Sequence, residues 1–235
     1  MISIIIPTLN EEKNIKTLLA IIQKGGFDDY EVIIADAGSI DKTIEIARKN
    51  NCIISKGGLP ARGRNIGAKI AKGDILFFLD ADLKFYPKNF LKLSVDYFTK
   101  NDLSVASFAI LPQKNNIYMN PFTLNLFYNI PQELLKKVFP MGAMGIMVKK
   151  DVFEKVKGFD ESITLAEDHY FVQQANKFGK FDIIKGVKIY MPLRRFEKDG
   201  YFRTSFKYLI CAFNMGVRRK PERKIRYDFG HYDKK

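Results

Sequence analysis

Short apolar runs alternate with helix-forming patterns through the first hundred residues of the chain. The runs at residues 3–6, 31–35, 52–54 and 75–79 have the length of strands. Between the first two runs, the apolar residues recur with the spacing of one helix face: Ile15, Leu18, Leu19 and Ile22. Continuously apolar strands linked by helices indicate a parallel sheet that is covered on both faces. The sequence therefore predicts an α/β fold, in which ligands bind beyond the carboxyl ends of the strands.

Local signals set the expected helix boundaries in this first half. Asn10 is expected to cap the first helix, because its side chain can accept a hydrogen bond from a free backbone N–H. Gly25 and Gly26 are expected to end that helix. A second helix is predicted from Asp41 onward and a third over residues 65–71.

The second half is less regular. Residues 119–140 are rich in aromatic residues and prolines, which favours an inserted lobe or lid. A further strand is predicted at residues 143–148, followed by a helix that starts within KKDVFEKV. Glu167 and Asp168 are expected to open another helix.

Length and cysteine content restrict the class of protein. With 235 residues the chain can bury one sizeable core, so we expect a single domain with an appendage. Cys52 and Cys211 lie far apart, which argues against a disulfide framework or a cysteine-based zinc site and fits a reducing, cytoplasmic compartment. The start of the chain has no secretory-signal pattern, and no run reaches the about 18 apolar residues of a membrane span.

Positive charge is concentrated towards the C-terminus. The formal net charge is +13, and residues 180–235 contain 16 Lys or Arg against 6 Asp or Glu, a net +10. This asymmetry favours an anionic partner: nucleic acid, a phosphorylated substrate or an acidic lipid surface. The alternative is a solvated basic tail without a partner.

Polar side chains follow the first, second and fourth predicted strands, and a further acidic pair opens the later helix. The four clusters are residues 7–11, residues 36–41, Asp80 with Asp82, and Glu167 with Asp168. The carboxyl ends of parallel strands meet at one sheet edge, so the first three clusters should converge. Asp41 alone is interpreted as a turn former or helix cap. Glu167 and Asp168 could equally serve the helix dipole.

The segment Asp80-Ala81-Asp82 suits a divalent cation. Mg2+ and Mn2+ bind carboxylate oxygens together with substrate phosphates. One carboxylate of the pair can hold the metal while the other contacts a nearby sugar hydroxyl. No G-x-x-x-x-G-K-[ST] or G-x-G-x-x-G pattern is present, which disfavours a P-loop phosphotransferase or a dinucleotide oxidoreductase. His169 and His231 have no nucleophilic Ser or Cys elbow to serve, which argues against a hydrolase triad.

Several short motifs follow one another in a fixed order. They are SIIIPTLNEEKNI, VIIADAGSIDKT, ARGRNIGAKIAKGDILFFLDADL, GFDES and AEDHYF. Together they resemble the family 2 glycosyltransferases, over roughly residues 2–200. The resemblance implies the GT-A fold, a Rossmann-like and mainly parallel sheet with helices on both faces. It also implies a catalytic domain at 1–200, with a nucleotide-binding half at 1–100 and an acceptor half at 101–200, and a basic amphipathic extension at 201–235.

The resemblance also implies roles for individual residues. Those that would line the base and ribose of the nucleotide are Pro7, Leu9, Glu11 and Asp36, with Arg64 nearby. Asp80 would face the ribose or the metal-bound donor, and Asp82 would be the main metal ligand. Asp168 would be the catalytic base, and Glu167 would support the geometry of the base or the acceptor.

Two positions depart from the family pattern. Ala37 stands where a second Asp is frequent, and Lys84 stands where a polyprenyl-phosphate-dependent subgroup often has Gln. A cation at Lys84 cannot ligate a metal, which weakens assignment to that subgroup. Arg62 and Arg64 are alternative charge partners for a diphosphate.

The activity that the resemblance implies is inverting sugar transfer from a UDP or GDP donor with Mg2+ or Mn2+. The acceptor would be a hydroxyl or a polyprenyl phosphate, and with a phosphate acceptor no base is needed. Rival hypotheses are a sugar-phosphate nucleotidyltransferase and a non-catalytic membrane or nucleic-acid binding module. The first would have a Gly-rich loop after the first strand, where this chain has Pro7-Thr8-Leu9-Asn10. Intact Asp82 and Asp168 argue against the second, so we expect no nucleic-acid partner.

Residues 202–218 form a basic amphipathic pattern. On a helical wheel an apolar stripe contains Phe202, Phe206, Leu209, Phe213 and Val217, with Arg203, Lys207, Asn214 and Arg218 on the adjoining face. Such a segment is typical of a helix that lies in a membrane surface. It would place the protein peripherally on the inner face of the membrane and favour a lipid-linked acceptor. The alternative is a helix that packs this stripe on the domain core.

Overall fold

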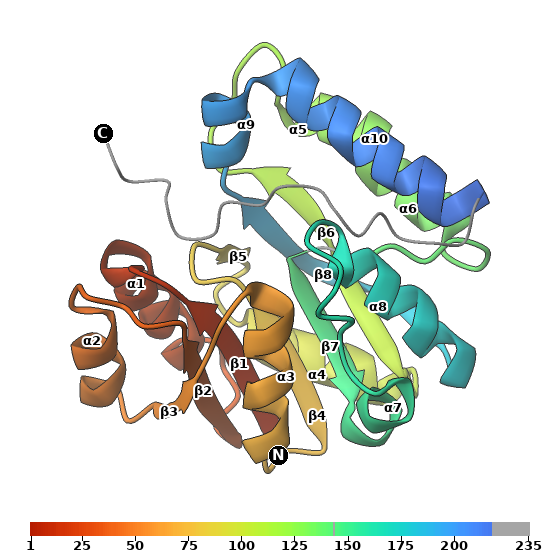
Figure 1. Ribbon diagram of the computed structural model, residues 1–235. Helices are drawn as coiled ribbons and strands as arrows, with labels where there is room; N and C mark the ends of the chain where they lie inside the picture. Colours follow the sequence, from red (N-terminus) through yellow and green to blue (C-terminus); the bar gives the residue numbers. More distant parts are fainter. Residues whose placement is uncertain (143, 218–235) are drawn as a thin grey trace.

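Eight strands form one sheet with helices on both faces (Figure 1). The computed structural model describes residues 1–142 and 144–217, apart from the side chains of residues 209, 212, 213 and 215–217. Within these residues the strand order is β3-β2-β1-β4-β7-β6-β8-β5. The carboxyl ends of the first four strands point to the same edge, at the top of Figure 1.

The first half follows the predicted alternation of strands and helices. The parallel strands are β1 (Ile2–Thr8), β2 (Tyr30–Asp36), β3 (Ile53–Lys56) and β4 (Ile75–Leu79). They are joined by α1 (Glu12–Gln23), α2 (Thr43–Lys49) and α3 (Pro60–Ile70). The α1 residues expected to face the core, from Ile15 to Ile22, are buried. The α/β prediction is confirmed here, and α3 starts five residues earlier than expected because Pro60 suits a first helical turn.

The second half makes the sheet mixed. Its strands are β5 (Lys84–Tyr86), β6 (Val105–Pro112), β7 (Gly145–Lys149) and β8 (Phe181–Met191). β7 is antiparallel to both β4 and β6, β8 is parallel to β6, and β5 is antiparallel to β8. The predicted strand at residues 143–148 is confirmed from Gly145 onward, and Ala143 lies outside the described residues. The helices are α4 (Phe90–Lys100), α7 (Lys150–Val156) and α8 (Glu167–Ala175), with a 3-10 turn, η2 (Asn176–Phe178).

Strand β4 is buried on both faces. Phe77 packs with Phe108 on the side covered by α1 and α4, at a centroid distance of 5.5 Å. Phe78 packs edge-on against Phe159 on the side covered by α3, α7 and α8, at 5.0 Å. Both side chains are at most 1% exposed, so the apolar run before Asp80 is explained by its central position.

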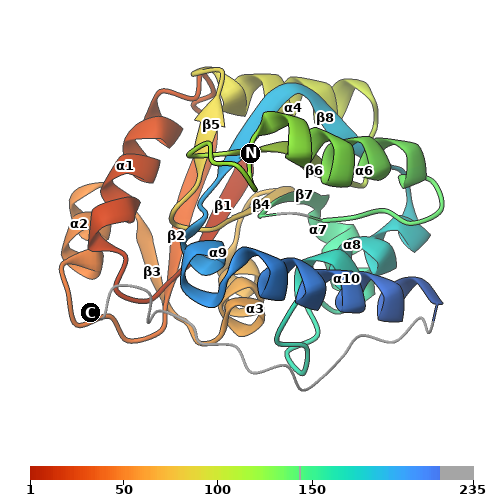
Figure 2. The ribbon, with the colours of Figure 1, turned by 90° about the horizontal axis from the view of Figure 1, so that it is seen from above.

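Helical segments cover the carboxyl edge of the sheet. They are α5 (Pro121–Leu124), η1 (Asn125–Asn129), α6 (Ile130–Leu135), α9 (Arg194–Asp199) and α10 (Tyr201–Val217). Viewed from above, α5 and α6 lie on one side of this edge and α9 and α10 on the other (Figure 2). The aromatic segment at residues 119–140 thus forms helices over the end of the sheet where the polar clusters lie.

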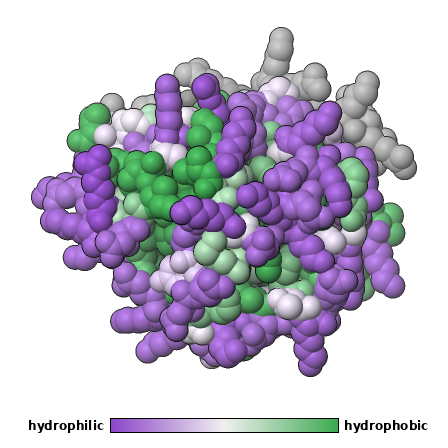
Figure 3. Space-filling model, turned by 90° about the horizontal axis from the view of Figure 1, so that it is seen from below, coloured by the Kyte–Doolittle hydropathy of each residue, from purple (hydrophilic) through white to green (hydrophobic). Residues whose placement is uncertain are grey.

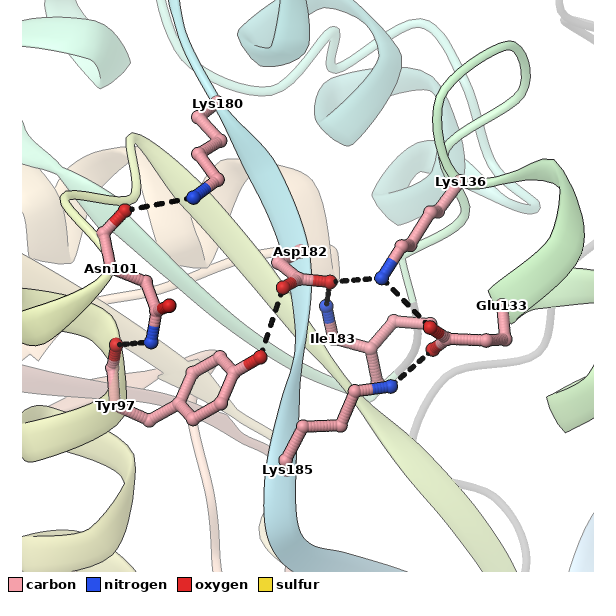
Figure 4. A network of polar contacts seen from close by, with 8 residues as sticks. All are labelled: Tyr97, Asn101, Glu133, Lys136, Lys180, Asp182, Ile183 and Lys185. Atoms are coloured by element: carbon pink, nitrogen blue, oxygen red, sulfur yellow. Dashed lines mark hydrogen bonds and ion pairs between the residues drawn. The ribbon is translucent and has the colours of Figure 1, made fainter.

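A polar network ties α6 to the sheet (Figure 4). Asp182 of β8 accepts hydrogen bonds from the hydroxyl of Tyr97 in α4 at 2.9 Å and from Lys136, just after α6, at 2.6 Å. Glu133 of α6 accepts from Lys136 at 2.8 Å and from Lys185 of β8. Because Asp182 is mostly buried, these bonds fix the position of α6 against the sheet.

The expected cap of α1 is wrong. The side chain of Asn10 accepts a hydrogen bond from the backbone N–H of Ile40 instead of capping its own helix. Asn10 has a φ of 56°, so the chain turns sharply before α1 begins at Glu12. The helix start is held by the neighbouring loop, which no local cap signal reveals.

Close packing of α3 on β1 gives a stability prediction. A Cβ added at Gly67 would stand 2.5 Å from Cγ2 of Ile5, whereas one added at Gly63 would meet Cβ of Pro7 at 3.1 Å. Both substitutions gain about 1 kcal/mol of helix propensity, so their difference isolates the clash. We expect Gly67→Ala to have a free energy of unfolding about 1–3 kcal/mol below that of Gly63→Ala in urea denaturation. Equal stability of the two variants would contradict this packing.

Candidate active site

The loops after β1 and β2 are bonded to each other. Three consecutive backbone N–H groups donate to side chains of the second loop: Asn10 to Ser39 and Glu11 to Thr43, both at 2.8 Å, and Glu12 to Asp41 at 3.1 Å. Asp41 also accepts from the backbone N–H of Thr43 at 2.9 Å, so its prediction as a turn former is confirmed. The two loops therefore form one rigid wall at the sheet edge.

Asp36, at the end of β2, shapes this wall. Its carboxylate accepts from the hydroxyl of Thr8 at 2.9 Å, from the backbone N–H of Gly38 at 2.9 Å and from that of Ser39 at 2.8 Å. Pro7 is buried at the end of β1, and Leu9 is half-buried just beyond it. These three residues predicted near the nucleotide thus lie on neighbouring strand ends.

Arg64 joins the end of β4 to the start of α8. Its Nη2 donates to Oδ1 of Asp80 at 2.7 Å, and its Nη1 donates to Oε1 of Glu167 at 2.8 Å. The Arg64 side chain is only 6% exposed, and its guanidinium lies 5.3 Å from the centre of the Phe159 ring. Burial disfavours the cation, but the charges of Asp80 and Glu167 outweigh it and raise the pKa of Arg64. Arg64 is therefore a permanent cation between two carboxylates.

The two carboxylates also respond to burial. Desolvation raises the pKa of Asp80 and that of Glu167, although Arg64 opposes the rise at both. The structure thus brings together Arg64, Asp80 and Glu167, which were predicted from separate parts of the sequence.

Asn65, next to Arg64 in α3, holds the loop that leads to α8. Its Nδ2 donates to the carbonyl of Phe159 at 2.9 Å, and its Oδ1 accepts from the N–H of Phe159 at 2.8 Å. Nδ2 also lies 3.0 Å from Oε1 of Glu161. The arginine-asparagine pair therefore positions two points of one loop.

Asp168 lies in the first turn of α8, beside His169. The two side chains are 3.2 Å apart, between Oδ1 of Asp168 and Nδ1 of His169. Burial alone would raise the pKa of Asp168, but the charges of His169 and Arg64 outweigh it and lower the pKa. The carboxylate raises the pKa of His169 in turn, against the effect of burial. Asp168 is thus held as an ionised carboxylate that can accept a proton.

Asp82 is paired with a residue that the sequence did not indicate. Nη2 of Arg194, the first residue of α9, donates to Oδ2 of Asp82 and lies 3.5 Å from Oε1 of Glu11. Burial raises the pKa of Glu11, while Asn14 and Arg194 oppose the rise. Sequence reasoning missed Arg194 because 112 residues separate it from Asp82 and no local motif marks it.

The protein carboxylates at this site supply part of the ligand set of a divalent metal. Among residues 1–142 and 144–217, no three His, Cys, Asp or Glu side chains are grouped so that they alone could hold a metal ion. Mg2+ is usually bound by one or two carboxylates and by substrate phosphates. Asp82, with Asp80 two residues earlier and Glu11 across the site, provides such carboxylates, so these residues fit a metal shared with a diphosphate.

Two cationic candidates lie outside this group. Lys84 is exposed and belongs to β5, where its backbone pairs with Tyr190. Arg62 is exposed on the surface of α3. An aromatic residue of the covering helices approaches Asp168 and His169. The Tyr128 ring of η1 lies 6.5 Å from that of His169, and burial, together with the nearby Asp168 charge, raises the pKa of Tyr128.

Comparison with known proteins gives the family and the fold. The model of the family described as "Glycosyl transferase family 2" matches residues 3–157. The chain is 26% identical over 232 residues to a 4,4'-diaponeurosporenoate glycosyltransferase of Staphylococcus haemolyticus, a match that covers 90% of this chain and 58% of that protein. The chain spans between 24% and 60% of the length of the first curated relatives it matches.

Solved structures share the fold. A Pyrobaculum calidifontis mannosyltransferase, solved in complex with GDP-Man and Mn2+, superposes with a TM-score of 0.74 at 19% identity, covering 95% of this chain and 65% of that one. Staphylococcus aureus TarS in complex with UDP gives a TM-score of 0.63 at 22% identity, covering 84% and 62%. These neighbours are glycosyltransferases of the GT-A fold, as the sequence predicts. With its motifs and its fold in agreement, the chain belongs to glycosyl transferase family 2.

Proposed function

We propose that this chain catalyses inverting transfer of a sugar from a nucleoside diphosphate donor to an acceptor, with Asp168 as the general base. The observation that carries the proposal is the bonding of Arg64 to both Asp80 and Glu167. Arg64 thereby links the end of β4, which is expected to face the donor, to the start of α8, which contains the proposed base Asp168. Donor and base are then held in one fixed relation, as a displacement reaction requires.

The donor side is proposed at the ends of β1, β2 and β4. The residues proposed to line the base and ribose are Pro7, Leu9, Glu11 and Asp36, with Arg64 and Asp80 behind them. Solved neighbours contain UDP, UDP-GlcNAc or GDP-Man, which supports a UDP or GDP sugar as the donor. Mn2+ in the mannosyltransferase neighbour supports a divalent metal, Mg2+ or Mn2+, held by Asp82 with Asp80. When bound, the metal would offset negative charge on the departing diphosphate.

Asp168 is proposed to take the proton of the acceptor hydroxyl. The lowered pKa keeps its carboxylate ionised, and the backbone N–H of His169 donates to its Oδ1 at 2.8 Å and orients that oxygen. Proton removal increases the nucleophilicity of the acceptor oxygen as it attacks the anomeric carbon. General base catalysis of this kind contributes about 10²- to 10⁴-fold in rate. Glu167 is charge-paired to Arg64 and is proposed to fix the start of α8.

A lipid-linked acceptor at a membrane surface is favoured by exposed apolar side chains. In the helices above the site and the turn after α6, six apolar side chains are each 63–86% exposed: Phe122, Phe127, Leu134, Val138, Phe202 and Phe206. In α10 the buried side chains include Thr204 and Cys211, so Phe202 and Phe206 do not pack on the core. The other stripe residues, Leu209, Phe213 and Val217, have side chains outside the described set, and Arg218 lies beyond it.

The proposed membrane contact combines this apolar surface with nearby positive charge. Arg203 and Lys207 of α10 and Lys137 after α6 lie next to the exposed apolar residues in the sequence. The opposite face, seen from below, is mostly hydrophilic with hydrophobic side chains gathered mainly in one area, and it is not part of the proposed contact (Figure 3). In the part of the chain that the structure describes, no helix combines the length and apolarity needed to cross a membrane. We propose a peripheral contact through α5, α6 and α10, which would bring a hydroxyl or polyprenyl phosphate acceptor to the site.

Substitutions at the two proposed catalytic positions should separate chemistry from binding. Asp168→Asn should lower turnover about 10²- to 10⁴-fold and leave donor affinity within about twofold, because the amide cannot accept the proton. Asp82→Ala should also weaken metal-dependent donor binding. Calorimetric donor titration and a transfer assay measure both effects, with the exposed Asp74→Asn as the matched control. Near-normal turnover of Asp168→Asn would remove its role as base, and a product that retains the donor's anomeric configuration by NMR would refute inversion.

Charge placed on the apolar surface should weaken membrane binding. We expect Phe127→Asp and Phe206→Asp each to reduce co-sedimentation with vesicles of phosphatidylcholine and phosphatidylglycerol by about tenfold at low salt. Each variant loses an aromatic side chain that would be buried in the membrane surface. Phe178→Asp is the control, since Phe178 is 49% exposed in η2, away from the covering helices. Absence of wild-type binding to these vesicles, or equal loss in all three variants, would contradict the membrane contact.

A further inference from the structure

Arg194 bridges two carboxylates of the proposed donor side. Its Nη2 bonds to Oδ2 of Asp82 and lies 3.5 Å from Oε1 of Glu11. It therefore places a positive charge at the very carboxylate proposed to hold the metal. The metal-ligand role alone gives no reason for a cation at Asp82.

The fold places Arg194 at this position. Strand β5, which begins two residues after Asp82, pairs with the end of β8, with Lys84 opposite Tyr190. Nε2 of Gln113 donates to the carbonyls of both Asp82 and Tyr190, at 2.7 and 3.0 Å. Phe196 of α9 is buried and stacks with Tyr201 at a centroid distance of 5.9 Å. The contact between Arg194 and Asp82 thus follows from the sheet register and the docking of α9.

Comparison with Arg64 shows that the two arginines differ in how easily they can leave their partners. Each guanidinium contacts two carboxylates, but the Arg64 side chain is 6% exposed and the Arg194 side chain is 30% exposed. Breaking a buried ion pair leaves an uncompensated charge and is strongly unfavourable. The Arg194 guanidinium can be solvated by water when it moves away, and this leaves Asp82, which is only 16% exposed, in need of another cation. Arg64 is therefore fixed in place, and Arg194 is displaceable.

We infer that Arg194 is a tethered cation that neutralises Asp82 in the donor-free enzyme and competes with the divalent metal for that carboxylate. The inference rests on the proposed role of Asp82 as metal ligand. A guanidinium and a metal ion repel each other at the same carboxylate, so Arg194 must leave Asp82 before the metal binds. The apparent metal affinity is then the intrinsic affinity multiplied by the fraction of time that Arg194 leaves Asp82 free. The chain thereby disfavours metal binding until a diphosphate adds its own negative charge.

Mn2+ titration of the donor-free protein tests this competition. We expect Arg194→Gln to bind Mn2+ about 5- to 30-fold more tightly than wild type in calorimetry, because it loses a charged hydrogen bond to Asp82. Arg194→Lys keeps a cation and should remain close to wild type. Arg195→Gln is the matched control: it removes the same charge from the next residue, which instead donates to the hydroxyl of Tyr208 at 2.7 Å. It should change the affinity by less than about twofold.

Asp82→Asn separates failure of this inference from failure of the proposed function. If Asp82→Asn abolishes Mn2+ binding while Arg194→Gln binds no more tightly than Arg195→Gln, the competition is refuted and the metal site stands. If Asp82→Asn binds Mn2+ as well as wild type, the metal role of Asp82 is wrong and the inference falls with it. Thermal unfolding of each variant identifies any change caused by loss of the fold.

Discussion

The buried guanidinium of Arg64 is the interaction on which the rest of the site depends. It bonds to Asp80 at the end of β4 and to Glu167 at the start of α8, which lie far apart in sequence. The Arg64 side chain is 6% exposed and cannot exchange its partners for water. Without Arg64, both carboxylates would lose the cation that compensates their charge. The end of the central strand and the first turn of α8 are therefore fixed relative to each other. Asp168, next to Glu167, acquires its position from a salt bridge in which it takes no part.

The cations of the site differ in how far they are exposed to water. Arg64 sits within the protein interior, between α3, β4 and α8, and behaves as part of the scaffold. Arg194 approaches from α9 on the open side and keeps contact with water. His169 supports Asp168 from within the same helix turn. The carboxylates of the candidate site thus have cationic partners of different exposure, 6% for Arg64 and 30% for Arg194.

Much of the first half was predictable because its signals are local. Continuous apolar runs predicted β1 to β4, and the spacing from Ile15 to Ile22 predicted the buried face of α1. The order of short motifs predicted the family and the GT-A fold. The mixed direction of β7 was not predictable, since strand direction depends on connections and not on composition. The cap at Asn10 failed because its partner, Ile40, belongs to another loop.

The residues of the site were less predictable than the fold. Sequence patterns indicated Asp80, Asp82 and Asp168 as chemically important, and the structure places their neighbours Arg64 and Glu167 in direct contact. Their roles in catalysis stay predictions. Arg194 carried no signal, because two adjacent arginines after a strand form no recognised motif and the contact of Arg194 with Asp82 spans 112 residues. Lys84, which departs from the family pattern, is exposed on β5.

Consecutive residues of α3 hold the loop before α8 at two points. Asn65 bonds to the backbone of Phe159, and Arg64 bonds to Glu167. Both ends of the intervening segment are thus attached to the same turn of α3. Between these two points Ile163, Leu165 and Ala166 are themselves buried. The segment is therefore held by α3 at its ends and by packing in its middle, so a change of its length would be passed on to the first turn of α8 and to Asp168.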